Sequence, residues 1–189
     1  GRIVFPIWDH LGQIVGFTGR ILNDNKKIAK YLNSPQTLIF NKSNLVYGLF
    51  HAKEYVRQEK KIILVEGQMD VLMAVQNGYN NVVAASGTSL SVDHLKLMTR
   101  RDESIILCFD SDAAGFKALE RAIILAWQVD IKVKVLEIPE DCGKDPDDCI
   151  QNHKDKWEEI IKSPLTVWQY YKKKWSGLKN LEEKKIINK

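Results

Sequence analysis

The sequence contains few cysteines and no long hydrophobic run. Its three cysteines lack the C-x-x-C spacing of zinc sites, so we expect no zinc in this chain and a reducing cellular compartment; they are Cys108, Cys142 and Cys149. No run of about 18 apolar residues occurs, which excludes a membrane-spanning helix. The first residues also lack the charged and then apolar layout of a secretory signal peptide.

An initiator methionine is absent as well, and a strand-like run begins directly after Gly1. This start predicts a fragment of a longer protein. The 189 residues suffice for one ordinary domain, or for one domain with an appendage. Hydrophobic residues make up 44% and charged residues 28%, which predicts a folded chain with a buried core.

The net charge is only +4, but the charges are segregated along the chain. Residues 1–61 carry a net charge of +6, residues 62–148 one of −7, and residues 149–189 one of +5. Two interpretations fit an acidic centre between basic ends: ordinary variation among solvated surface charges, or a metal-dependent site for a polyanion with cations around it. The positions of the acidic residues decide between them.

The first 60 residues predict short strands and one helix. Residues 2–8 and 14–20 read as a β-hairpin, and Pro6 suits an edge strand. An extended run over residues 30–35 ends at a proline. A helix with Ser43 as its N-cap is expected next, because apolar residues recur there at helical spacing.

From residue 61 onward, predicted strands and helices alternate. The strands are mostly continuous apolar runs, which are typical of strands buried on both faces; they cover residues 61–65, 81–85, 104–109 and 131–138. Helices are predicted over residues 69–77, 92–100 and 113–127. This alternation predicts an α/β fold with a parallel sheet and right-handed crossovers. After residue 139 we expect a polar loop over residues 140–148 and then helices.

Acidic residues follow three of the four predicted strands. Ligands of open parallel sheets bind beyond the carboxyl ends of the strands, so we expect these carboxylates to share one edge. Like charges held together repel unless a cation pairs them, and oxygen ligands suit Mg²⁺ or Mn²⁺. The pattern therefore predicts metal-assisted phosphate chemistry, although a lone Asp in such a place is more often a helix N-cap. The acids are Glu66, Asp70, Asp110, Asp112, Asp145 and Asp147.

These acids lie in motifs that resemble a TOPRIM domain. The motifs are E-G-x-x-D, G-T-S, D-x-D-x-A-G and D-P-D, each after a predicted strand and in this order. TOPRIM domains occur in DnaG-type primases, type IA and type II topoisomerases, RecR-like proteins and OLD-family nucleases. Four upstream segments resemble the stretch just before TOPRIM in bacterial DnaG-type primases; they are residues 2–7, 16–20, 30–35 and 45–49. The resemblance covers residues 1–175.

The resemblance implies a TOPRIM parallel-sheet domain with a flanking α+β amino-terminal segment and a carboxy-terminal helical segment. Residues 1–59 would be the last part of the basic amino-terminal subdomain of the primase core, and residues 60–142 the TOPRIM domain. Residues 143–189 would hold the acidic D-P-D loop and the start of a helical subdomain. The zinc-binding and helicase-binding domains of complete DnaG-type primases are not recognised in this sequence.

Site roles follow from the same resemblance, position by position. The catalytic metal-binding acids would be Glu66, Asp110 and Asp112, and the acids completing the metal site would be Asp70, Asp145 and Asp147. Contacts with nucleotide or DNA are implied for Arg20, Lys30, Asn33, Lys42, Gly87 and Thr88. For any single lysine the alternative is solvated surface charge, and for Gly87 and Thr88 it is an ordinary strand-to-helix turn.

The implied enzyme is bacterial, cytoplasmic and nucleoid-associated. It would make short RNA primers on single-stranded DNA from ribonucleoside triphosphates, by nucleotidyl transfer with two Mg²⁺ or Mn²⁺ ions. A replicative helicase would bind through a domain absent from this chain, and no membrane partner is expected. Two alternatives stay open: another TOPRIM enzyme, either a nuclease or a topoisomerase, and a degenerate primase domain that serves as a scaffold. Tyr170 and Tyr171 lie in a helical pattern, which favours a structural role over that of a topoisomerase nucleophile.

Overall fold

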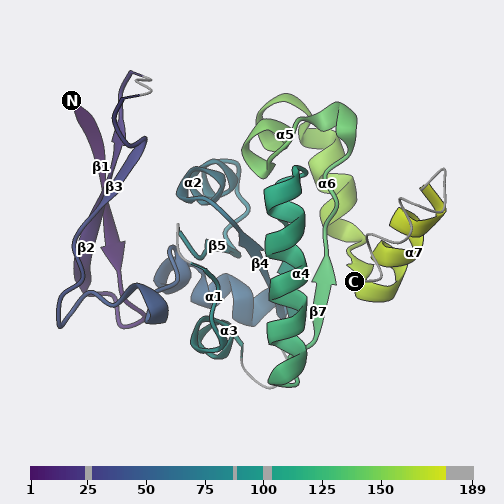
Figure 1. Ribbon diagram of the computed structural model, residues 1–189, viewed down its shortest axis with the longest axis horizontal. Coiled ribbons are helices and arrows are strands. Elements are labelled where there is room, and N and C mark those ends of the chain that lie inside the picture. Colours follow the sequence, from purple (N-terminus) through teal and green to yellow (C-terminus); the bar gives the residue numbers. More distant parts are fainter. Residues whose placement is uncertain (24–26, 87–88, 100–103, 178–189) are drawn as a thin grey trace.

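The computed structural model describes residues 1–23, 27–86, 89–99 and 104–177. These residues form a small sheet that stands beside a larger sheet covered by helices (Figure 1). The strands are β1 (Arg2–Trp8), β2 (Ile14–Ile21), β3 (Tyr31–Asn33), β4 (Lys61–Val65), β5 (Val82–Ala84), β6 (Ser104–Leu107), β7 (Val133–Val135) and β8 (Leu165–Thr166). The helices are α1 (Leu49–Glu59), α2 (Gln68–Gln76), α3 (Val92–Met98), α4 (Ala113–Gln128), α5 (Pro146–Asn152), α6 (Lys154–Lys162) and α7 (Val167–Gly177), with short 3₁₀ helices η1 (Lys42–Asn44) and η2 (Glu140–Cys142).

The small sheet is antiparallel, in the order β1-β2-β3. Its β1–β2 hairpin is closed by Asp9, whose Oδ1 accepts hydrogen bonds from the backbone N–H groups of Leu11 (2.8 Å) and Gln13 (2.9 Å). Gly12 supplies a φ of +90° in the same turn. Pro6 lies on β1, at the edge of this sheet. The predicted hairpin and edge strand are both confirmed.

The large sheet has the order β5-β4-β6-β7-β8, with β8 alone antiparallel to its neighbour. Alternate residues of β4 point to opposite faces, and both sets are buried: Ile62 and Leu64 on one face, Ile63 and Val65 on the other. Helices α1, α3 and α4 cover the first face, and α2, α5 and α6 cover the second. The predicted α/β fold with a parallel sheet is confirmed. Helices on both faces of the sheet bury the continuous apolar runs of its strands.

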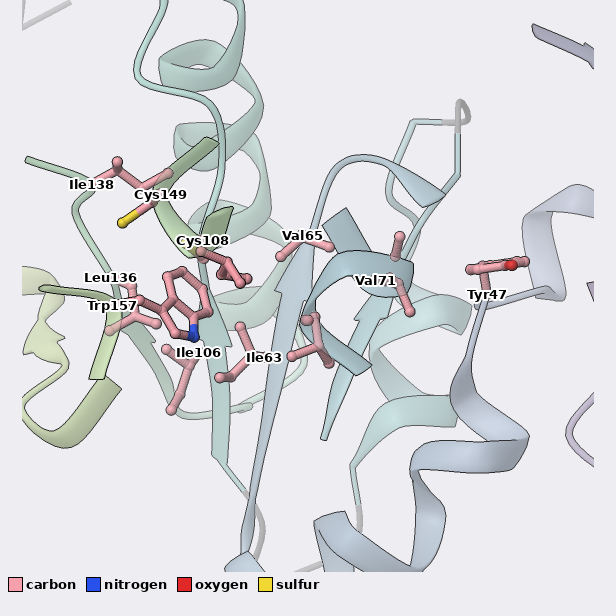
Figure 2. Packing of buried hydrophobic residues seen from close by; sticks show 14 of the residues in the cluster. Tyr47, Ile63, Val65, Val71, Ile106, Cys108, Leu136, Ile138, Cys149 and Trp157 are labelled. Atoms are coloured by element: carbon pink, nitrogen blue, oxygen red, sulfur yellow. The ribbon is translucent and has the colours of Figure 1, made fainter. Parts of the chain in front are cut away.

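Trp157 fills the core beneath α6. Its side chain is fully buried, and Figure 2 shows the indole against Ile106 of β6 and Leu136, which directly follows β7. The ring of Tyr79 meets it edge to face, with 6.0 Å between the ring centroids. This single side chain therefore joins α6 to the second face of the sheet.

Several connections differ from the sequence-based expectation. The residues at Ser43 form η1, which is capped by Asn41, and α1 begins only at Leu49; the predicted N-cap at Ser43 is wrong. The reason is Gly48, whose φ of +83° turns the chain between η1 and α1. Helix α5 begins inside the predicted loop because Asp145 caps it, with Oδ1 accepting from the Asp148 N–H at 2.8 Å.

The carboxy-terminal part also holds a strand where only helices were expected. Leu165 and Thr166 pair with β7 and extend the large sheet by β8. Breaks between elements lie close to the predicted domain limits at residues 59/60 and 142/143, and the limits themselves stay predictions. Within the described ranges, no helix combines the length and the apolar character needed to cross a membrane.

Trp157→Ala is expected to lower the free energy of unfolding by about 3–5 kcal/mol, because it leaves a large cavity in the core. Trp168→Ala is the matched control, since this indole is 75% exposed, and it is expected to change stability by less than about 0.5 kcal/mol. Urea unfolding followed by circular dichroism measures both. Equal losses in the two variants would contradict the packing described for α6.

Candidate functional site

A cleft of about 490 Å³ lies between the small sheet and the carboxyl ends of the parallel strands. One wall carries the predicted cationic and amide side chains Arg20, Lys30 and Asn33. The opposite wall carries five of the predicted acids, namely Glu66, Asp70, Asp110, Asp145 and Asp147. The fold thus brings residues that lie far apart in the sequence to one site, with positive charge facing negative charge across it.

Glu66 and Asp110 meet because their strands, β4 and β6, are neighbours in the sheet. Glu66 Oε1 accepts a hydrogen bond from the Asp110 backbone N–H at 3.0 Å. Gly115, in the first turn of α4, makes this approach possible: a Cβ there would overlap the Asp110 carbonyl oxygen and lie 2.9 Å from Glu66 Oε1. The glycine of the D-x-D-x-A-G motif is therefore a packing requirement of the acidic edge.

Asp70 connects two of the acidic loops. Its Oδ2 accepts from the Gly67 N–H at 2.9 Å and its Oδ1 from the Asp147 N–H at 3.3 Å. The side chain is 7% exposed. Asp70 thus fixes the start of α2 against the start of α5, and both of its oxygens already have partners.

Asp112 lies outside the cleft lining and caps α4. Its Oδ1 accepts from the N–H groups of Ala114 and Gly115, both at 2.9 Å, and these bonds hold the pKa of its carboxyl below the ordinary value. The N-cap alternative raised by the sequence is therefore confirmed for Asp112. Both bonds use one oxygen, so Oδ2 stays available to a ligand, and metal binding by Asp112 remains a prediction.

Burial and crowding of like charges disfavour ionisation at two of the acids. Desolvation, with Asp145 and Asp110 nearby, raises the pKa of Asp70 to about 7, although the hydrogen bonds from Gly67 and Asp147 oppose the shift. Desolvation raises the pKa of Asp110 to about 6, and the charges of Glu66, Asp145 and Asp112 add to it. An arrangement of this kind favours a bound cation, which would relieve the repulsion.

The donor set suits a hard divalent cation such as Mg²⁺ or Mn²⁺, since carboxylate oxygens dominate it. Across the described residues, however, no three His, Cys, Asp or Glu side chains are already grouped as a metal centre. The reason is visible in the hydrogen bonds: Glu66, Asp70 and Asp112 each turn oxygen atoms toward backbone amides. Coordination would use the remaining oxygens of Glu66 and Asp112 and the side chain of Asp110.

The cationic wall is ordered by an aromatic ring that the sequence analysis did not single out. The guanidinium of Arg20 lies 5.7 Å from the centroid of the Tyr31 ring, and its Nη1 donates to the Tyr31 hydroxyl at 3.3 Å. Asn33 Oδ1 is buried and has no hydrogen-bond partner among the described residues. Lys42 lies beside the cleft, in a cavity of about 20 Å³ that also contacts Asn33.

Other lining residues were missed by sequence reasoning as well. The charge of Lys144 opposes the rise of the Asp110 pKa and adds to the lowering of the Asp112 pKa. Ser86 adopts a φ of +52° that non-glycine residues rarely take. Lys144 was visible beside the D-P-D motif, whereas nothing in the sequence signals the backbone of Ser86. Gly87 and Thr88 lie outside the described residues.

Two family models match consecutive parts of the chain. The model described as DNA primase catalytic core, N-terminal domain, matches residues 1–53, and the model described as Toprim-like matches residues 63–150. The DNA primase of Campylobacter jejuni is 42% identical over 173 residues, which are 90% of this chain and 28% of that protein. The chain belongs to the DnaG-type DNA primase family. The predicted family is thereby confirmed, with the chain spanning less than a third of that relative.

Solved primases share the fold. The structure of the Aquifex aeolicus primase, with its zinc-binding and RNA polymerase domains, has a TM-score of 0.84 and 36% identity, over 97% of this chain and 44% of that chain. A DnaG primase catalytic domain bound to single-stranded DNA has a TM-score of 0.78 and 34% identity, over 89% of this chain and 55% of that chain. The small sheet, the large sheet and the cleft between them therefore correspond to part of a primase catalytic core.

Asp110→Asn is expected to stabilise the chain at pH 8 without divalent cations. The folded-state pKa of about 6 lies above the ordinary 3.8, so the ionised carboxylate destabilises the fold above pH 6 and has no such effect below about pH 4. After allowance for solvent screening of this half-buried group, the gain is about 1 kcal/mol, or about 2–4 °C in Tm. The change in Tm is measured by thermal unfolding with EDTA at pH 8 and at about pH 4. The exposed Asp155→Asn is the control. A lower Tm for Asp110→Asn at pH 8 would contradict the electrostatic account.

Gly115→Ala is expected to destabilise the chain by about 1–3 kcal/mol through overpacking. Helix propensity alone predicts the opposite sign, a gain of about 1 kcal/mol. The sign is therefore decided by the clash with the Asp110 carbonyl oxygen. Urea unfolding distinguishes the two, and a variant more stable than the wild type would show that the approach of α4 to the acidic edge is loose.

Proposed function

We propose that this chain forms part of a primase catalytic core and takes part in the synthesis of short RNA primers on single-stranded DNA from ribonucleoside triphosphates. The observation that carries the proposal is the cleft in which carboxylates at the ends of parallel strands face the cations of the small sheet. Support comes from relatives named DNA primase and from the similar catalytic domain solved with single-stranded DNA.

The cationic wall binds phosphate groups in this proposal. Arg20 and Lys30 offer positive charge to the triphosphate or to the template backbone, and this contribution is sequence-independent. The contact with Tyr31 restricts the Arg20 side chain, which lowers the entropy lost on binding. Asn33 Oδ1 needs a donor, and a hydroxyl or amino group of the nucleotide supplies one.

Mg²⁺ or Mn²⁺ would be held by Glu66 and Asp110 of the acidic wall together with Asp112 at the start of α4. The bound ions would supply a lower pKa for the attacking hydroxyl and charge neutralisation for the leaving pyrophosphate. Asp70 keeps the loops of Gly67 and Asp147 in register through its two hydrogen bonds. Asp145 and Asp147 add negative charge from the α5 side of the cleft. The protein then acts by positioning and charge neutralisation.

Neither Tyr170 nor Tyr171 fits the role of a topoisomerase nucleophile. Such an enzyme needs a tyrosine hydroxyl that reaches DNA, whereas Tyr170 is 5% exposed and burial raises the pKa of its hydroxyl well above the ordinary value. Burial also raises the pKa of Tyr171. Both tyrosines pack α7 against the large sheet and take the structural role that their spacing indicates.

Primer synthesis is tested with this sequence in place of the matching 173 residues of the Campylobacter jejuni primase. We expect template-dependent ribonucleotide incorporation with Mg²⁺ or Mn²⁺. We expect Glu66→Gln to reduce it by about 100-fold or more while circular dichroism stays unchanged, because a charge-stabilising group is lost. The exposed Glu159→Gln is the matched control.

Two outcomes of this experiment would contradict the proposal. Full incorporation by Glu66→Gln would remove the acidic edge from the chemistry. Cleavage of DNA in the absence of ribonucleotides, abolished by the same substitution, would indicate a nuclease in place of a primase.

A further inference from the structure

Two side chains of α3 hold the backbone of η1. His94 is fully buried, and its Nε2 lies 2.8 Å from the Lys42 carbonyl oxygen. Ser91, the N-cap of α3, donates from Oγ to the Ser43 carbonyl oxygen at 3.1 Å. Because a carbonyl oxygen only accepts hydrogen bonds, both side chains act as donors to η1. Ser91 Oγ also lies 3.0 Å from His94 Nδ1, so its single proton is shared between the Ser43 carbonyl oxygen and this nitrogen.

The other contacts of His94 fix the state of its ring. Nδ1 accepts a hydrogen bond from the Ser91 backbone N–H at 3.1 Å, so the proton of the neutral imidazole lies on Nε2. Ser91 Oγ in turn accepts from the His94 backbone N–H at 3.2 Å. This reciprocal capping box orients the ring toward Lys42 before any ligand binds.

The segment that these side chains hold is the connection between the two walls of the cleft. After β3, the chain reaches the large sheet through Phe40, which is 2% exposed, and through η1. It is fixed again at Tyr47, which exchanges two backbone hydrogen bonds with Ala84 of β5, at 2.8 and 3.1 Å. The Lys42 carbonyl oxygen lies between these two anchors. Its contact with His94 therefore restrains the connection between the two walls, in addition to the direct contacts of the small sheet with α1, such as that of Trp8 with His51.

We propose that His94 is a positioning residue that sets the separation between the cationic and the acidic walls of the cleft through its hydrogen bond to the Lys42 carbonyl oxygen. That the cleft binds a polynucleotide rests on the proposed function. The role of His94 in setting the separation does not depend on it. Without this hydrogen bond, a smaller fraction of molecules has the two walls at the separation at which both contact the same ligand. The apparent affinity for single-stranded DNA falls by that fraction.

Two substitutions divide the roles of the ring. His94→Gln keeps an N–H donor at about the place of Nε2 and loses the acceptor for Ser91. His94→Asn keeps the acceptor at about the place of Nδ1 and loses the donor for Lys42. If His94 only fills the core and caps α3, Asn should preserve the wild-type properties better than Gln. If His94 positions η1, Gln should preserve them better than Asn.

The separation is measured directly by electron spin resonance between spin labels at Leu32→Cys on β3 and Ile124→Cys on α4. Both positions are more than half exposed. The three native cysteines are buried, and burial raises the pKa of their thiols, so they label slowly. We expect one narrow distance distribution for the wild type and His94→Gln, and a broader or displaced one for His94→Asn.

Binding of a fluorescent single-stranded oligonucleotide in Mg²⁺ is the second readout. We expect His94→Gln to bind within about two-fold of the wild type and His94→Asn to bind more weakly by about five-fold or more. Ser91→Ala removes the neighbouring contact to η1 and is expected to broaden the distance distribution too. It provides a second variant for the distance measurement if His94→Asn does not fold.

Identical narrow distributions in the wild type, His94→Asn and Ser91→Ala would overturn the positioning role. Equal loss in His94→Gln and His94→Asn would overturn it as well, since the Lys42 contact would then not matter. A wild-type chain that binds no oligonucleotide would count against the proposed function, while the distance measurement still decides the role of His94.

Discussion

Backbone amide groups hold mutually repelling carboxylates at one edge of the large sheet, and the rest of the site depends on this. The neighbouring strands β4 and β6 place Glu66 against the Asp110 amide, and Asp70 accepts from amides on two separate loops. These bonds compensate only part of the free-energy cost of holding ionised carboxylates together in a partly buried site. The pKa of Asp110 and that of Asp70 therefore stay raised. The fold therefore keeps a destabilised acidic edge that a divalent cation would stabilise.

The small sheet supplies the opposite charge. Arg20 and Lys30 reach the same cleft as the acids, although they lie in a separate sheet with its own hairpin. The modest net charge of +4 thus combines a basic amino-terminal part and an acidic centre, which face each other across the cleft, with a basic carboxy-terminal part. The short connection through η1, where α3 holds the backbone, joins the two surfaces, and the ring contact of Trp8 with His51 of α1 adds a direct contact between the small sheet and the helices.

Much of the fold was predictable because its signals are local. Apolar runs gave β4 and β6, and the acids that follow them were expected at one edge because parallel strands end together. Helix α5 was not predicted because Asp145 and Pro146 are also typical of a turn. Strand β8 was not predicted because its two residues are too few to show an alternating pattern. The role of His94 was not visible in the sequence, since its partner Lys42 lies 52 residues away and offers only a backbone oxygen.

The most direct test of the acidic edge is calorimetric titration of Mn²⁺ into the chain at pH 6.5 in two buffers with different ionisation enthalpies. At this pH the raised pKa values, about 7 for Asp70 and about 6 for Asp110, leave part of each carboxyl protonated. Cation binding must therefore release protons. The account predicts saturable binding with a buffer-dependent heat that shows this release. Absence of binding, or binding with the same heat in both buffers, would contradict it.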